Sequence, residues 1–162
     1  MRTKGDTVQL ATYLNDHLSG STAVLDLLGH MEQAHPDLAP LLKDLRHEIE
    51  LERKELEALI DRLGATHGPV RRAAAWVAEK FARLKLTVDD PPGNKLKRLE
   101  SLESVAVGIH GKWSLWQALK VIPAADGPNY DRLIAQAEAQ RERVEMARLD
   151  AARAAFEGEG KS

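Results

Sequence analysis

Cysteine is absent from the 162 residues of this chain, and aromatic residues make up only 4% of it. Without thiols the protein forms no disulfide, no thiolate metal site and no cysteine nucleophile, and this composition suits a reducing compartment. The sequence also has no apolar run of about 18 residues and no signal-peptide core near its start. We therefore expect a cytoplasmic protein that neither spans nor binds a membrane.

Charge of one sign is not in excess either. The chain has 23 Lys and Arg against 25 Asp and Glu, for a formal net charge of −2. A nucleic-acid-binding surface needs surplus positive charge, so we expect no nucleic-acid partner. Hydrophobic residues (43%) and charged residues (30%) occur in proportions typical of a folded domain. We expect residues 1–162 to form a single domain.

Residues that start and stop helices divide the chain into helical segments, and no segment shows the alternation typical of a strand. Asp6 is expected to cap the first helix and Pro36 to end it. Asp37 is expected to cap the second helix, Gly64 to close it, and Asn94 to cap a later one. The predicted helices cover about 7–34, 38–63, 69–86, 95–122 and 129–156.

Four of these helices are long and one, over 69–86, is short. A short turn joins the first two long helices and another joins the last two, so each pair is expected to be antiparallel. A much longer connection, which contains the short helix, separates the two pairs. The predicted fold is all-α: a four-helix bundle with a long helical crossover between its second and third long helices.

Two segments resemble the ferritin-like superfamily, and bacterioferritin in particular. Residues 14–21 (LNDHLSGS) resemble the opening Leu-Asn-x-x-Leu-x-x-Glu of that family. Residues 107–119 (VGIHGKWSLWQAL) resemble its Glu-x-x-Gly-x-x-x-Leu-x-x-Ala stretch. The resemblance implies a ferritin-like bundle, in which two helices each supply a carboxylate and two supply a Glu-x-x-His pair to a di-iron centre.

Carried over to this chain, the di-iron ligands are degenerate. The residues at the six ligand positions are, in chain order, Ser21, Glu48, Leu51, Gly108, Ala137 and Gln140. Only Glu48 keeps a ligating side chain of the family, so we expect no cofactor, with iron as the alternative. An improvised metal site would have to combine His17, Glu48, Glu52 and His110.

One charged residue, Glu52, interrupts the apolar stripe of the helix over 38–63, between Ile49 and Leu56. An unpaired buried carboxylate costs on the order of several kcal/mol, so Glu52 is expected to be buried and to have a partner. The candidate polar cluster at mid-bundle consists of His17, Ser21, Glu52, Gln140 and Arg141, with Arg148 as the alternative arginine. The cluster either fixes the register of the helices or binds a small molecule.

The helix over 95–122 has two apolar stripes, and a helix that is apolar on two faces needs a second partner. One stripe contains Trp113 and Trp116. The other consists of Val105, Gly108, Leu115, Leu119 and Ile122. The short helix with Trp76 could cover one face, or the tryptophan-containing face could form a homodimer in which Gly108 and Gly111 permit close approach. The third reading places the tryptophans in an ordinary core.

These features favour a metal-free, ferritin-like structural or interaction protein that is not an enzyme and forms a homodimer. Two alternatives stay open. One is a di-iron oxidoreductase or iron-handling protein of the ferritin-like kind, and the other is a small-ligand binder that uses the bundle core. The sequence itself names no substrate or partner.

Overall fold

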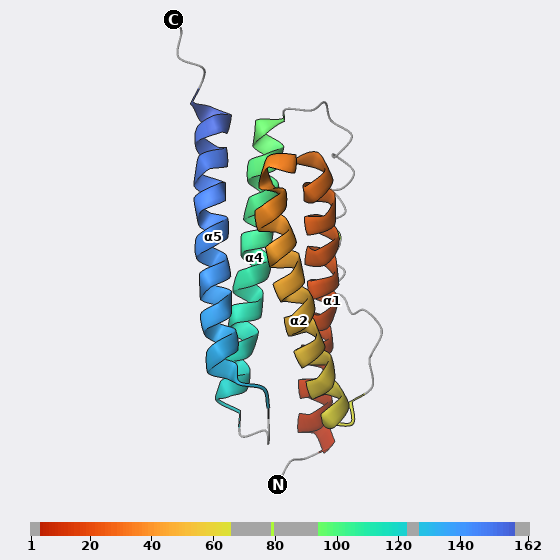
Figure 1. Cartoon of the computed structure of the whole chain (residues 1–162). Coiled ribbons are helices and arrows are strands. Elements are labelled where there is room, and N and C mark those ends of the chain that lie inside the picture. Colours follow the sequence, from red (N-terminus) through yellow and green to blue (C-terminus); the bar gives the residue numbers. More distant parts are fainter. Residues whose placement is uncertain (1–3, 66–78, 80–93, 123–126, 158–162) are drawn as a thin grey trace, which may run out of the picture.

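The computed structural model describes residues 4–65, 79, 94–122 and 127–157 (Figure 1). The elements in these ranges are α1 (Lys4–Ala34), the short 3₁₀ helix η1 (Pro36–Leu38), α2 (Ala39–Arg62), α4 (Lys95–Lys120) and α5 (Tyr130–Phe156). No strand occurs in these ranges, so the predicted all-α, four-helix fold is confirmed for the described part of the chain. The predicted helix over 69–86 lies outside it, apart from Glu79.

The four helices pack as two antiparallel hairpins, α1 with α2 and α4 with α5 (Figure 1). α2 runs towards the end of the bundle where the N-terminus lies, whereas α4 starts at the opposite end (Figure 1). α2 and α4 therefore run in the same direction. The two points that residues 66–93 connect lie at opposite ends of the bundle, as the predicted crossover requires.

Local chemistry sets most helix ends where the sequence predicts them. α1 ends at Ala34, and His35, the residue before Pro36, is not helical, because proline disfavours helical geometry in the residue before it. Gly64, just past α2, has a φ of 63°, a left-handed conformation that glycine adopts at little cost. The side chain of Asn94 accepts a hydrogen bond of 3.1 Å from the backbone N–H of Lys97 and caps α4.

Two predicted caps are wrong. α1 begins at Lys4, so Asp6 lies inside the helix instead of preceding it. Asp37 lies in η1, because the chain first forms a 3₁₀ turn and α2 starts only after Leu38, where no side chain caps it. The Asp37 carboxylate instead pairs with Arg98 of α4 at 2.7 Å. It therefore links the α1–α2 connection to the other hairpin.

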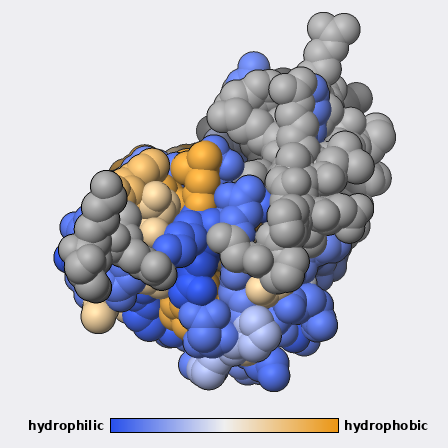
Figure 2. All heavy atoms as spheres, turned by 90° about the horizontal axis from the view of Figure 1, so that it is seen from above, coloured by the Kyte–Doolittle hydropathy of each residue, from blue (hydrophilic) through white to orange (hydrophobic). Residues whose placement is uncertain are grey.

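The core consists of two hydrophobic clusters. The first lies towards the α1–α2 connection and contains Val24, Leu27, Leu28, Met31, Leu42, Leu45, Ile49, Leu99, Leu102, Val105, Ile109, Ala137, Val144 and Ala151. The second lies towards the other end and contains Leu14, Leu18, Leu56, Leu59, Ile60, Leu115, Trp116, Leu119, Leu133 and Ile134. Figure 2 shows the bundle from above. In the coloured part of this view, small groups of hydrophobic residues lie between hydrophilic ones.

α1 and α4 approach closely at Gly108. A Cβ atom added there would lie 2.5 Å from Cγ2 of Val24, which is well inside van der Waals contact. The sequence predicts this close approach between two copies of the chain, but the structure places it within one chain, between α4 and α1. A Cβ atom added at Gly111, one turn along, would meet no atom of the described residues within 4 Å.

We expect Gly108→Ala to lower the free energy of unfolding by about 1–3 kcal/mol, because Val24 is buried and β-branched and has little freedom to move aside. Gly29→Ala is the matched control, since a Cβ there meets nothing within 4 Å. It should be neutral or stabilise by up to about 1 kcal/mol. Urea denaturation measures both variants. Equal stability of the two would show that the close approach does not constrain the bundle.

Candidate functional site

The site is a polar layer between the two hydrophobic clusters. Its central residue is Glu52 of α2, which lies between Ile49 of the first cluster and Leu56 of the second. Glu52 is 2% exposed, so its predicted burial is confirmed. A carboxylate in this position is stable only with partners that replace the water it has lost.

The partner cation is Lys112 of α4. Its ammonium group forms an ion pair with the Glu52 carboxylate, and the lysine side chain is only 14% exposed. The predicted arginine partner is therefore wrong. Arg141 is exposed, because the residue after the inward-facing Gln140 points about 100° away from it around α5. Arg148 pairs with Glu145, at 2.6 Å.

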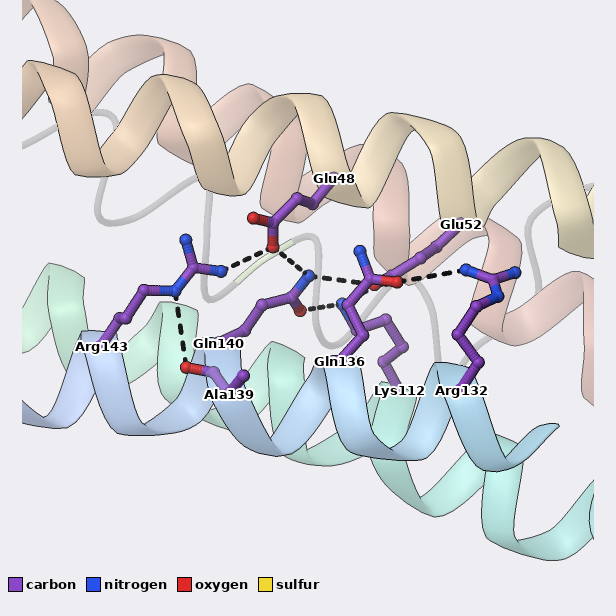
Figure 3. A network of polar contacts seen from close by, with 8 residues as sticks. All are labelled: Glu48, Glu52, Lys112, Arg132, Gln136, Ala139, Gln140 and Arg143. Carbon is purple, nitrogen blue, oxygen red and sulfur yellow. Dashed lines mark hydrogen bonds and ion pairs between the residues drawn. The ribbon is translucent and has the colours of Figure 1, made fainter. Parts of the chain in front are cut away.

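Gln140 of α5 connects this ion pair to a second carboxylate (Figure 3). Its amide nitrogen donates to Glu52 Oε1 at 2.9 Å and to Glu48 Oε2 at 2.8 Å. Its amide oxygen accepts a hydrogen bond from Lys112. The predicted contact between Glu52 and Gln140 is therefore confirmed. The amide can have only this orientation, since the reverse one would direct its oxygen at two carboxylates.

Glu48 is held by Arg143 of α5, whose guanidinium donates to Glu48 Oε2 at 2.6 Å. Partial burial by itself would raise the pKa of Glu48, but the hydrogen bonds from Arg143 and Gln140 outweigh it and lower that pKa below its ordinary value. Glu48 is thus ionised at neutral pH and matched by its own cation. The layer contains two carboxylates and two cations.

Burial affects the ion pair itself in the opposite way. Loss of water raises the pKa of Glu52, although the charge and hydrogen bond of Lys112 act against this. Loss of water likewise lowers the pKa of Lys112, against the attraction of Glu52. Both shifts reduce the free energy needed to move the proton from the ammonium to the carboxylate.

A cavity of about 270 Å³ lies beside this ion pair. Its described lining comes from α1, α2 and α4 and is mainly apolar, with Val24, Ile49, Leu56, Ile109, Leu115 and Trp116 among the lining residues. Gly20 and Gly111 also line it, and a Cβ added at either would meet no atom within 4 Å among the residues that the structure describes. Val107, which is 72% exposed, lies at its edge.

The predicted polar cluster is assembled only in part. His17, Ser21 and Glu52 all line the cavity, whereas Gln140 and Arg141 do not appear in its described lining. The Ser21 hydroxyl donates to the backbone carbonyl of Leu18 at 2.6 Å. Ser21 therefore shares the cavity with Glu52, but its hydroxyl donates this hydrogen bond within its own helix.

His17 packs edge-on against Tyr13, with ring centroids 4.7 Å apart. Burial lowers the pKa of His17, and the negative charge of Asp16 offsets this only in part. The imidazole is therefore neutral at pH 7. It adds a polar but uncharged group to the cavity wall.

The four residues of the improvised metal site do not meet. His110 is exposed and stacks on Trp113, with ring centroids 5.5 Å apart. The Glu48 carboxylate forms an ion pair with Arg143, and the Glu52 carboxylate forms one with Lys112. Within the described ranges, no group of three or more His, Asp or Glu residues is arranged to hold a metal ion.

Two of the three tryptophans are accounted for within the bundle. Trp116 is 1% exposed and belongs to the second hydrophobic cluster. The indole N–H of Trp113 donates to Glu138 of α5 at 3.1 Å. Trp76 lies outside the described residues. The face of α4 with Trp116 is therefore covered by the chain's own helices.

Comparison of the chain with protein-family models, curated proteins and solved structures gives no match. None of the helices in the described ranges combines the length and apolar character needed to cross a membrane. Neither result points to an activity. A function is therefore inferred from the geometry of the cavity and of the ion pair beside it.

Removal of one member of the ion pair should destabilise the fold strongly. We expect Glu52→Ala to cost about 3–5 kcal/mol, because Lys112 is left buried without its counter-charge. At about 2–4 °C per kcal/mol for a chain of this size, the melting temperature should fall by about 10 °C. The double variant Glu52→Leu/Lys112→Met, which removes both charges, should recover most of this loss. A melting temperature of Glu52→Ala equal to wild type would contradict the prediction.

His17 should make stability depend on pH. Because its pKa is lower in the folded state, the unfolded chain binds more protons, and stability rises with pH up to about 6.5. The pKa of His35 is also lowered, by burial and by Arg98, so it adds a slope of the same sign. His17→Gln should remove one part of the slope and His35→Gln the other. Urea denaturation from pH 5 to 7 tests this, and an unchanged slope in the double variant would refute it.

Proposed function

We propose that this protein is a metal-independent four-helix bundle that binds a small, largely apolar molecule in the cavity between α1, α2 and α4. The observation that carries the proposal is the space of about 270 Å³ beside the Glu52–Lys112 pair. An apolar cavity with a few convergent polar groups is the usual form of a small-molecule site, and this volume lies just below the range of such sites, which starts at about 300 Å³.

The glycines around the cavity support this proposal. Glycine inside a helix costs about 1 kcal/mol relative to alanine, and Gly20 and Gly111 both have room for a side chain. Larger residues at these positions would favour the helices and fill the empty space. Glycine at both positions keeps the space open for a ligand.

The charges of the polar layer support metal independence. Carboxylates at a di-metal site are compensated by the ions they bind. Here Lys112 compensates Glu52 and Arg143 compensates Glu48. Elemental analysis after growth in iron-rich medium tests this point, and stoichiometric iron or manganese would favour the di-iron alternative.

The ferritin-like resemblance remains part of the proposal. Four of the six positions that match its di-iron ligands lie at this site, since Ser21 and Gly108 line the cavity and Glu48 and Gln140 belong to the polar layer. We therefore propose that the cavity occupies the place of a lost di-iron centre. A purely structural role of the same layer is the competing interpretation.

Interaction with other chains also remains a prediction. A homodimer through the tryptophan-containing face of α4 would use Trp113, which is half-buried, because Trp116 is buried. Light scattering with size-exclusion chromatography measures the oligomeric state. The cytoplasmic location is likewise still a prediction of the sequence.

Binding of the uncharged apolar dye N-phenyl-1-naphthylamine tests the proposed cavity. We expect saturable fluorescence enhancement at one dye per chain. Gly111→Leu directs a side chain into the cavity and should weaken binding by about tenfold or more, which corresponds to about 1.4 kcal/mol. Gly29→Leu is the matched control, because Gly29 also lies on a helix with open space around its Cβ position but is not among the described lining residues.

Two results would count against the cavity as a binding site. One is the absence of saturable dye binding to the folded wild-type chain. The other is equal weakening by Gly111→Leu and Gly29→Leu, which would place the dye on a surface elsewhere. Thermal melts of both variants establish that each remains folded.

A further inference from the structure

We propose that Lys112 is a reactive amine and that the cavity binds small uncharged aldehydes or ketones, which form a reversible imine with it. The inference rests on the proposed function, since it names the chemical class of the ligand. It follows from the position of the lysine, from the groups that contact its ammonium, and from the cavity beside it.

The position of Lys112 suits this chemistry. The lysine lines the cavity together with Ile109, Leu115 and Trp116, and its side chain is 14% exposed. Lysines in apolar sites are the ones that act as nucleophiles towards carbonyl compounds, because loss of water favours the neutral amine. A lysine that served only as a surface charge would extend into solvent.

Glu52 is in direct contact with the ammonium and can accept its proton. The step then balances as follows. Lys112 passes one proton to Glu52, and the neutral amine adds to the carbonyl carbon to give a carbinolamine. Glu52 returns the proton, the hydroxyl group leaves as water, and a protonated imine remains. The C=O bond is replaced by a C=N bond, and no oxidant or reductant takes part.

The product is compatible with the same surroundings. A protonated imine keeps the positive charge of Lys112, so the pairing with Glu52 persists. The Gln140 amide oxygen accepts a hydrogen bond from the Lys112 ammonium and so positions the nitrogen before the reaction. The protonated imine keeps one N–H, which remains for Glu52. Because Glu48 is matched by Arg143, it does not draw the ammonium away.

The lining also limits the class of carbonyl compound. Apolar walls favour aliphatic or aromatic groups. The charges in the described lining balance, Asp16 and Glu52 against Arg53 and Lys112, so they offer no net attraction to a charged substituent.

Reductive trapping tests the proposal. The full chain is incubated with benzaldehyde and sodium cyanoborohydride at pH 7.5, and the benzylated lysines are identified by peptide mass spectrometry. We expect Lys112 to be modified about tenfold faster than Lys120, because burial favours its neutral amine and the cavity holds the aldehyde beside it. Lys120, 49% exposed on the same helix, is the internal reference.

Two controls separate the cavity from general amine reactivity. Lys112→Arg keeps the cation beside Glu52 but cannot form an imine, so the fast reaction should disappear, whereas Lys120→Arg should leave it intact. Excess N-phenyl-1-naphthylamine should protect Lys112 in the wild-type chain without any substitution. This second control does not depend on whether a variant folds.

The outcomes distinguish this inference from the proposed function. If the dye binds once per chain but Lys112 reacts no faster than Lys120, the imine proposal is wrong and the apolar binding site stands. If the dye does not bind to the folded chain, the proposed function fails. Fast modification of Lys112 that the dye prevents supports both.

Discussion

The buried ion pair between Glu52 and Lys112 is the interaction on which the rest of this bundle depends. It joins α2 to α4, and Gln140 brings α5 to the same point through hydrogen bonds to both partners. Charges inside a protein are tolerated only when their partners are present. The three helices therefore have one relative register in which carboxylate, ammonium and amide meet. A shift of one helix by a turn would leave a charged group against a hydrophobic cluster.

The cavity belongs to the same layer. Above and below it, leucine, isoleucine and valine side chains fill the space between helices. At the level of the ion pair, α1 and α4 instead present small residues, among them Gly20, Ser21 and Gly111. The contact of Gly108 with Val24 sets how closely α1 and α4 approach. Small side chains beside a fixed helix spacing leave an apolar space whose floor contains a paired acid and amine.

Much of this arrangement could be predicted from local patterns. Proline, glycine and asparagine place the helix ends because their effects act within one turn, and Glu52 is recognisable as buried because it interrupts an apolar stripe. Lys112 likewise interrupts an apolar stripe, since it lies between Gly108 and Leu115 on the same face of its helix. An interrupted stripe on each of two helices is the pattern that would have identified the pair.

The sequence by itself determined that the chain is helical, where its long helices lie and that Glu52 needs a partner, since these follow from periodicity, caps and the cost of burying a charge. Only the tertiary structure decided that the partner is Lys112 and not Arg141. That choice depends on the rotation of each helix about its axis, which small differences in packing set. The tertiary structure alone also decided the cavity, because an empty volume is the difference between the spacing of helices and the size of the side chains between them.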